Sequence, residues 1–136
     1  MGESAKHLEL VKRIITYMEK IPNIEASLIQ SDLPESIEKP DSTMEGFRPD
    51  IYYNYSNFMI IGEAKTSYDF ERKHSIEQYE AYYNKCNAFN GKSIFILAIP
   101  WTESISAKNL LRRIRKNSNY EIETWVINDT GRVEKL

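Results

Sequence analysis

The first twenty residues carry hydrophobic side chains at helical spacing. Between residues 4 and 20, the hydrophobic positions fall on one half of a helical wheel: Leu8, Leu10, Val11, Ile14, Ile15, Tyr17 and Met18. The charged positions fall on the other half: Lys12, Arg13, Glu19 and Lys20. This pattern predicts an amphipathic helix, which ends before Pro22.

Two strands joined by a short turn are predicted next to one another. Residues 48–55 and 58–65 are separated only by Ser56 and Asn57, and a gap of two residues is the length of a tight hairpin turn. Upstream, residues 24–30 predict a shorter strand. Residues 31–46 contain two prolines among acidic side chains and predict an irregular loop.

The second half of the chain alternates between helices and strands. Residues 75–90 predict a helix, because Ser75-Ile-Glu-Gln78 has the form of a capping box and Gly91 follows the expected end. Residues 93–99 are almost all hydrophobic, which is typical of a central strand. A third helix over 106–116 and a strand over 121–127 complete the order α-β-β-β-α-β-α-β. Since 136 residues suit one domain, we expect a single α/β domain spanning 1–136.

The hairpin brings three ionisable residues together. If Ser56 and Asn57 form the turn, Tyr55 faces Phe58 and the numbers of paired residues sum to 113. Asp50 and Glu63 have that sum, so they lie opposite one another, with Cβ atoms roughly 4.5–5.5 Å apart. Lys65, two residues beyond Glu63, lies on the same face.

This trio suits hydrolytic chemistry on a phosphodiester. Two adjacent carboxylates raise each other's pKa unless a cation intervenes, and Mg²⁺ accepts carboxylate oxygens while keeping waters. A metal-bound water becomes a better nucleophile, and a lysine can orient that water or offset charge on a phosphate. The alternative is a surface salt bridge between Asp50 and Lys65 worth ~0–1 kcal/mol.

The local context resembles the PD-(D/E)xK nuclease superfamily. Pro49-Asp50 is followed by Gly62-Glu63-Ala64-Lys65 at the end of the next strand. The order of elements from residue 4 to residue 99 is similar to the restriction endonuclease-like αβββαβ core, a central mixed sheet flanked by helices. The third helix and last strand are additions to that core. Gln78-Tyr-Glu-Ala-Tyr82 resembles the QxxxY motif of the RecB-like branch.

The resemblance implies a ligand set for Mg²⁺ or Mn²⁺: His7, Asp50, Glu63 and the carbonyl of Ala64. It assigns Lys65 to the nucleophile. The helical wheel independently turns His7 inward, where it is either a metal ligand or a buried histidine satisfied by a hydrogen bond. Glu3, one turn earlier, is the substitute ligand, and Glu9 points to the polar side. A histidine ligand favours Mn²⁺ over Mg²⁺.

Two further sets of residues are candidates for the site. Gln78 and Tyr82 share one edge of their helix, where they hold Lys65 or the substrate backbone, or else serve as a capping partner and as packing. Lys108, Arg112 and Arg115 share one face of the third predicted helix, which either binds nucleic-acid phosphates or is a solvated surface.

Composition narrows the remaining possibilities. The formal net charge of −2 does not indicate nucleic-acid binding. No apolar stretch approaches the ~18 residues that span a bilayer. Cys86 is the single cysteine, so neither an internal disulfide nor a cysteine zinc cage is expected, and on its apolar stripe it is predicted to be buried and inert. We expect a cytoplasmic protein.

Two functional hypotheses follow. The first is a metal-dependent DNA nuclease, acting as a homodimer or with a partner protein that supplies specificity. The second is a catalytically inactive module of the same fold that binds nucleic acid or a protein. The carboxylate pair favours the first, and the low net charge favours the second.

Overall fold

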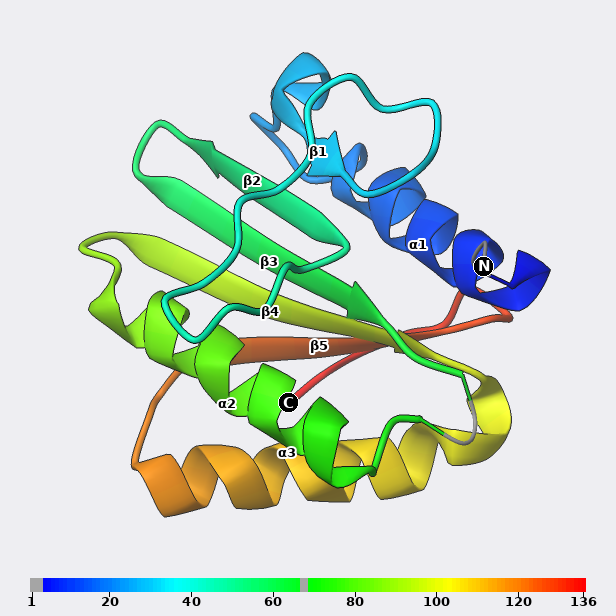
Figure 1. Ribbon diagram of the computed structural model, residues 1–136, viewed down its shortest axis with the longest axis vertical. Helices are drawn as coiled ribbons and strands as arrows, with labels where there is room; N and C mark the ends of the chain where they lie inside the picture. Colours follow the sequence, from blue (N-terminus) through cyan, green and yellow to red (C-terminus); the bar gives the residue numbers. More distant parts are fainter. Residues whose placement is uncertain (1–3, 67–68) are drawn as a thin grey trace.

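The computed structural model describes residues 4–66 and 69–136, and places six strands in one mixed sheet between helices (Figure 1). The sheet order follows the chain from β1 to β6. The strands are β1 (Gln30–Ser31), β2 (Ile51–Tyr55), β3 (Phe58–Ala64), β4 (Lys92–Ile99), β5 (Glu123–Asn128) and β6 (Val133–Lys135). Neighbouring strands are antiparallel except for the pairs β3–β4 and β4–β5, which are parallel. The expected mixed sheet flanked by helices is confirmed at this level.

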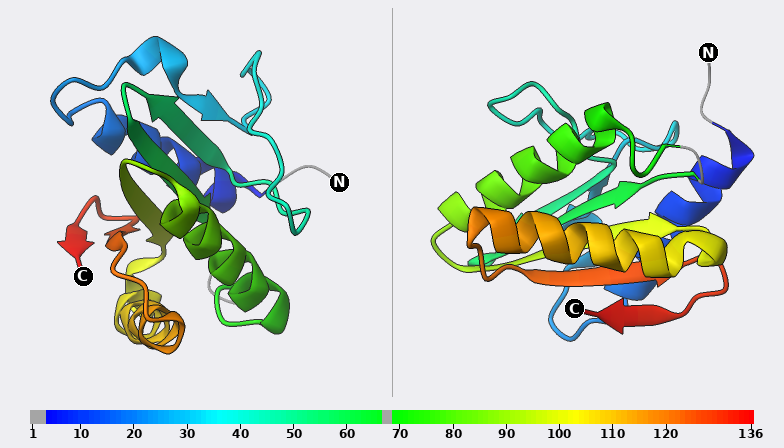
Figure 2. Two further views of the ribbon diagram at one scale, coloured as in Figure 1. Left: turned by 90° about the vertical axis from the view of Figure 1, so that its left-hand side faces the viewer. Right: turned by 90° about the horizontal axis from the view of Figure 1, so that it is seen from below.

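Helices cover both faces of the sheet. They are α1 (Ala5–Met18), α2 (Lys73–Ala88) and α3 (Ser104–Ser118), with short 3₁₀ turns at η1 (Ala26–Leu28) and η2 (Trp101–Glu103). Helix α1 packs on one face and α2 and α3 pack on the other (Figure 2). Alternate residues of β3 therefore face different helices: Ile60 packs in the α1 cluster, and Met59 and Ile61 pack in the α2–α3 cluster.

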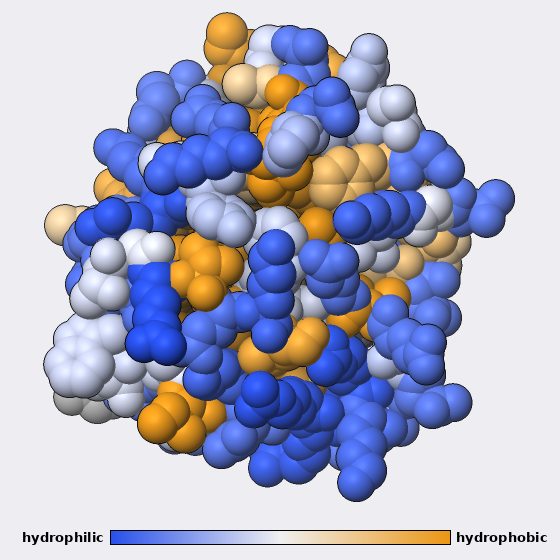
Figure 3. All heavy atoms as spheres, turned by 180° about the vertical axis from the view of Figure 1, so that it is seen from behind, coloured by the Kyte–Doolittle hydropathy of each residue, from blue (hydrophilic) through white to orange (hydrophobic). Residues whose placement is uncertain are grey.

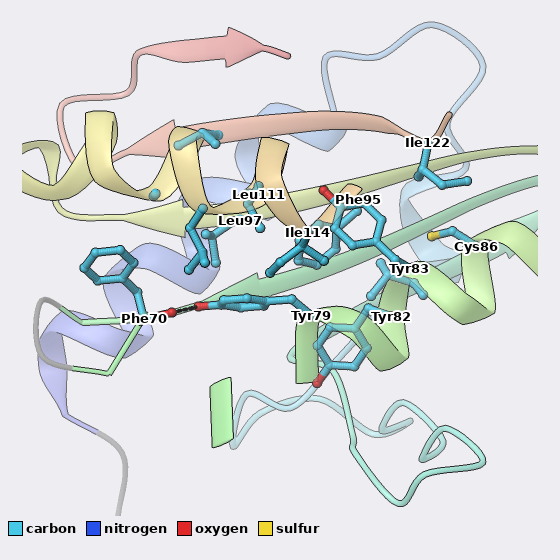
Figure 4. Packing of buried hydrophobic residues seen from close by; sticks show 14 of the residues in the cluster. Phe70, Tyr79, Tyr82, Tyr83, Cys86, Phe95, Leu97, Leu111, Ile114 and Ile122 are labelled. Carbon is cyan, nitrogen blue, oxygen red and sulfur yellow. Dashed lines mark hydrogen bonds between the residues drawn. The ribbon is translucent and has the colours of Figure 1, made fainter. Parts of the chain in front are cut away.

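The α2–α3 cluster is rich in aromatic side chains whose polar ends are satisfied. Tyr79 donates a hydrogen bond to the carbonyl of Phe70 at 2.8 Å, and the hydroxyl groups of Tyr83 and Thr124 lie 2.7 Å apart. Figure 4 shows the Tyr82 hydroxyl pointing away from the apolar side chains of this cluster. Cys86 is buried here, and burial raises the pKa of its thiol to about 12, which fits the predicted inert thiol.

The turn and the register of the predicted hairpin are confirmed, although β2 begins at Ile51 instead of residue 48 and β3 ends at Ala64 instead of residue 65. Tyr55 pairs with Phe58, and the ladder continues in that register to Ile51 and Gly62. Ser56 and Asn57 both have positive φ, 55° and 63°, as a type I′ turn requires. The turn therefore sets the register that brings Asp50 beside Glu63.

Two sequence predictions are wrong, and one strand was missed. The predicted strand over 24–30 does not form: Ala26–Leu28 make the η1 turn, and only Gln30, together with Ser31, pairs with β2. Helix α2 begins at Lys73, so Ser75 lies inside its first turn and donates to the carbonyl of Asp69 instead of forming a capping box. The short β6 was not anticipated, because a run of three residues carries too little pattern.

Gly91 also has a different role from the predicted helix terminator. Helix α2 ends at Ala88, and Phe89 follows it in an extended conformation. A Cβ atom at Gly91 would lie 2.5 Å from the carbonyl oxygen of Asn57. Glycine at this position lets the start of β4 approach the β2–β3 turn, where Lys92 donates to that same carbonyl at 3.2 Å.

The face opposite to the view of Figure 1 is mostly polar. The face seen in Figure 3 shows small hydrophobic areas separated by hydrophilic side chains. Within residues 4–66 and 69–136, no helix is long and apolar enough to cross a membrane.

Candidate active site

The candidate site lies at the carboxyl end of β3, on the right in Figure 1, where this strand approaches the amino end of α1. Asp50 directly precedes β2, Glu63 lies near the end of β3, and Lys65 directly follows it. The two carboxyl residues are buried and the lysine is mostly buried. The hairpin register therefore places these three residues together, as the sequence predicts.

Backbone groups fix both carboxylates. The amide of Asp50 donates to Glu63 Oε1 at 3.2 Å, and the amide of Ala64 donates to Asp50 Oδ2 at 2.9 Å. These reciprocal bonds continue the β2–β3 pairing through side chains after the regular ladder ends. The Ala64 amide thus holds Asp50, a contact that the sequence pattern did not indicate.

Lys65 is held by two partners. Its ammonium donates to Gln78 Oε1 on α2 and lies 3.4 Å from Glu63 Oε2. Gln78 therefore does not cap the helix; it fixes the lysine. Tyr82, one turn further along α2, donates its hydroxyl to Glu63 Oε1 at 3.2 Å. The two α2 residues thus contact two members of the predicted trio.

The site is short of positive charge. Burial, and then the nearby Asp50 carboxylate, raise the pKa of Glu63 to about 8, although Lys65 opposes the shift. Burial and the Glu63 carboxylate also raise the pKa of Tyr82, so its hydroxyl stays a donor. Two carboxylates beside one ammonium leave one negative charge, which a proton on Glu63 or a bound cation neutralises.

His7 joins the site from α1. Its Nε2 lies 3.2 Å from Asp50 Oδ1, and its side chain is 18% exposed. The helix starts at the right place because the Ser4 hydroxyl accepts the backbone amide of His7 at 3.1 Å, as an N-cap does. The predicted inward orientation of His7 is confirmed.

Glu9 does not enter the site. Glu9 is half-exposed and pairs with Lys6 at 3.7 Å, which confirms its predicted outward orientation. Glu3 lies outside the residues that the structure describes.

The donor chemistry of the site fits a hard divalent cation. Among residues 4–66 and 69–136, no three His, Cys, Asp or Glu side chains are already gathered as a metal-holding group. However, Mg²⁺ commonly uses one or two carboxylates and keeps several waters. Neighbouring ligands on an ion with bonds of about 2.0–2.1 Å lie roughly 3 Å apart, so the separation of His7 and Asp50 suits two ligands of one ion as well as a hydrogen bond.

The basic residues of α3 do not extend this site. Lys108 is bound to Glu134 of β6. Arg115 donates to the carbonyl of Ile122 at 2.9 Å and to that of Leu136 at 3.4 Å. Ile122 precedes β5, at the end of the sheet opposite to Lys65, so Arg115 lies away from the candidate site. Phosphate binding by the face that carries Lys108, Arg112 and Arg115 stays a prediction. Sequence spacing put these cations on one helix face but could not identify what that face packs against.

A second group of contacts on the same sheet edge was missed. Asp129, which follows β5, accepts the Lys6 ammonium at 2.5 Å and the Trp101 amide at 2.9 Å. Lys6 lowers the pKa of Asp129, although desolvation opposes the shift. The sequence did offer a signal for this group. Trp101 and Asp129 follow the strands β4 and β5, and residues that follow parallel strands gather at one edge of the sheet.

A surface hollow of about 550 Å³ lies elsewhere, beside β1 and the exposed Ile37, and is lined by none of the residues of the candidate site.

Comparisons of the whole chain with protein-family models, with curated proteins and with solved structures give no match.

Proposed function

We propose that this chain is a metal-dependent nuclease that hydrolyses phosphodiester bonds in DNA. The observation that carries the proposal is the buried contact network of Asp50, Glu63 and Lys65 at one end of the sheet. Like-charged residues placed together in a sheet destabilise it, and burial increases the cost. Binding of a cation and a phosphate at this site would account for the cost of burying two carboxyl groups together.

The fold supports the same proposal. Helix α1, strands β1 to β4 and helix α2 follow the αβββαβ order of the PD-(D/E)xK superfamily, and we propose that they form such a core. Helix α3 and strands β5 and β6 then extend the sheet beyond it. Gln78 contacts Lys65, as expected for the proposed QxxxY motif, and Tyr82 contacts Glu63 in place of Lys65.

The residues have distinct proposed roles. His7, Asp50, Glu63 and the Ala64 carbonyl would hold Mg²⁺ or Mn²⁺, which supplies Lewis acidity and lowers the pKa of water. The Lys65 ammonium, positioned by Gln78, stabilises negative charge that develops on the phosphate. Tyr82 keeps the Glu63 carboxylate oriented. In the overall reaction, a water oxygen attaches to phosphorus, the bond from phosphorus to one ester oxygen breaks, and that oxygen receives a proton.

A non-catalytic binding module is the second candidate. The observation that favours it is the engagement of both Glu63 oxygens by Tyr82, Asp50 and Lys65, since a ligand that binds metal must exchange some of these partners. The two candidates differ in whether the chain cleaves DNA.

Cleavage of supercoiled plasmid tests the proposal. With Mg²⁺ or Mn²⁺, we expect the wild-type chain to nick or linearise the plasmid, and EDTA to stop the reaction. Lys65→Ala is expected to lose at least 100-fold in rate, because loss of one charge-stabilising group costs about 10²–10³ in rate. Lys20→Ala, an exposed lysine just beyond the far end of α1, is the matched control and is expected to cleave normally.

Cleavage by Lys65→Ala at the wild-type rate would show that this site is not the catalytic one. Absence of cleavage by the wild-type chain on plasmid and on single-stranded circular DNA would favour the binding module.

A further inference from the structure

An exposed tryptophan lies on the same edge of the sheet as the candidate site. Trp101 starts the η2 turn directly after β4 and Pro100, and is 61% exposed. The carboxyl end of β4 is next to the site, because the Lys65 amide donates to the carbonyl of Ala98 at 3.0 Å. Ile105, four residues beyond Trp101, is 71% exposed. Tryptophan is among the residues that proteins bury most on average, so its exposure here is informative.

The backbone of Trp101 is fixed relative to α1 by Asp129. One carboxylate oxygen of Asp129 accepts the Trp101 amide, and the other accepts the Lys6 ammonium. Lys6 directly precedes His7. The bridge therefore ties three segments together along the edge: the amino end of α1, the β5–β6 turn and the β4–α3 connection. It uses no atom of the indole ring, which stays available to a ligand.

The charges around Trp101 favour a base over a phosphate as its ligand. Asp129 is paired with Lys6, and Glu103 lies two residues beyond Trp101 in the chain, so these three groups together carry no net positive charge to attract a phosphate. Stacking of a base on an aromatic ring is worth ~1–3 kcal/mol and tolerates any base, because every base has a π-face. Stacking is therefore the contribution that this edge supplies best.

Duplex binding has less support in the distribution of charge. Affinity for duplex DNA comes mainly from several lysine and arginine contacts to phosphates. The chain carries a net charge of −2, and the Lys108 and Arg115 side chains of α3 are engaged by β6 and by backbone carbonyls. A strand with unpaired bases recovers through stacking what this surface lacks in positive charge.

We infer that Trp101 stacks an unpaired base of single-stranded DNA whose backbone runs along the sheet edge to Lys65. This inference rests on the proposed nuclease function, and it names the substrate class as single strands or duplexes with frayed ends. Trp101 positions the strand and takes no part in the bond cleavage.

Binding measured without divalent metal tests the inference apart from catalysis. In EDTA, a fluorescent 12-nucleotide oligothymidylate and a blunt hairpin duplex whose loop is a linker without bases are titrated with the chain, and anisotropy is recorded. We expect Trp101→Ala to weaken binding of the oligothymidylate by about 5- to 150-fold, the equivalent of the stacking energy. Trp101→Phe keeps a stacking ring and is expected to stay within threefold of wild type. Ile105→Ala is the matched exposed control and is expected to bind normally.

Tryptophan emission gives an independent readout. The second tryptophan, Trp125, is buried and forms a T-shaped contact with the ring of Tyr17, so it contributes a constant background. We expect oligothymidylate to quench the emission of the wild-type chain, and the hairpin duplex to quench it at least fivefold less at equal concentration.

Two outcomes would overturn the inference: equal affinity of Trp101→Ala and wild type for the single strand, or equal quenching by the duplex. These results are separate from plasmid cleavage. A chain that cleaves but binds single strands without Trp101 leaves the nuclease proposal intact. A chain that binds through Trp101 but cleaves nothing leaves only the stacking site.

Discussion

Two carboxyl groups at the end of the β2–β3 hairpin dominate the chemistry at the scale of single residues. Asp50 and Glu63 are both buried, and Lys65 is the nearby cation that contacts Glu63. Each carboxylate is oriented by the backbone amide beside the other one. Both carboxylates are therefore held by backbone donors in the absence of a ligand, as in a preorganised centre.

Manganese is expected to stabilise the folded chain. A ligand at 100 times its Kd that binds only the folded state adds ~2.7 kcal/mol to the free energy of unfolding, which raises Tm by on the order of 10 °C for a chain of this size. Thermal melts with and without Mn²⁺ measure the rise, and Asp50→Ala is expected to abolish it. Asp41→Ala, in the exposed acidic loop, is the control; an equal rise in Asp50→Ala would place the metal elsewhere.

The stability of the metal-free chain is expected to fall between about pH 5 and pH 8. The pKa of Glu63 is raised from 4.5 to about 8 in the folded chain, so the folded state binds this proton more tightly than the unfolded state. The resulting stabilisation is complete below about pH 4.5 and is lost as pH rises through 8. Urea unfolding in EDTA at several pH values measures this slope.

Glu63→Gln removes that titration and keeps an acceptor for Tyr82 and for the Asp50 amide. We therefore expect the variant to show a flatter dependence of unfolding free energy on pH, and to be more stable than wild type at pH 8–9 by a few kcal/mol at most. Identical slopes in both proteins would mean that Glu63 titrates normally.

Sequence reasoning identified Asp50, Glu63 and Lys65 because a tight turn fixes the register of a hairpin. Once the register is fixed, the residue opposite each position follows from the residue numbers. It left His7 open between a ligand and a core residue, since a wheel gives direction but no distance. It missed the amides of Asp50 and Ala64 as partners, because backbone donors carry no signature in the sequence.

At the scale of elements, Gly62 sets how closely α1 approaches the sheet. A Cβ atom at Gly62 would lie 3.1 Å from Ile51 Cβ and 3.2 Å from Ile14 Cγ2. Ile14 is on α1, the helix that carries His7. The small residue therefore connects helix packing to the position of a candidate ligand.

Gly62→Ala is expected to push α1 outward and to cost ~1–3 kcal/mol of stability, as overpacking does. Because His7 moves with the helix, the rise in Tm with Mn²⁺ is expected to shrink as well. Gly46→Ala is the control: nothing lies within 4 Å of its Cβ position, but its φ of +91° makes alanine strained. Gly46→Ala is expected to lose stability while keeping the full rise in Tm with Mn²⁺. If Gly62→Ala also keeps the full rise, the position of α1 does not influence metal binding.

Strong periodic segments predicted their elements well, and short ones did not. Helix α1 and strands β2 to β5 follow from repeated patterns over five or more residues. The 24–30 segment failed because its apolar residues alternate as a strand does while the chain turns at η1. The capping box failed because Ser75 and Gln78 have tertiary partners, Asp69 and Lys65, which outweigh a local motif.

At the scale of the whole molecule, positive charge on α3 is partly neutralised by Glu134 of β6. The basic side of α3 faces the C-terminal strand: Lys108 binds Glu134, which also pairs with Arg132 at 3.5 Å. Lys108 and the nearby positive charges of Arg132 and Arg112 lower the pKa of Glu134. The sequence showed the cations of α3 but gave no indication of β6, so their pairing was unforeseeable.

Glu134→Gln is expected to release this positive charge for nucleic acid. We expect tighter binding of oligonucleotides at low salt and a steeper dependence of binding on salt, by up to about 0.9 in logarithmic slope for each phosphate contacted. Stability is expected to change little, because exposed ion pairs contribute little to it. Anisotropy titrations over a series of salt concentrations measure this slope, and Glu19→Gln is the control. Equal slopes for Glu134→Gln and Glu19→Gln would show that α3 does not contact the nucleic acid.

Helix α1 contributes both to the hydrophobic core and to the candidate metal site. Leu10, Val11 and Ile14 are fully buried against the sheet, whereas His7 occupies the first turn, where helices fray. A metal ion bound at His7 would clamp that turn to β2. Amide hydrogen exchange in residues 8–11 would then slow on metal binding far more than exchange in α3, and the protection pattern would map the site without any substrate.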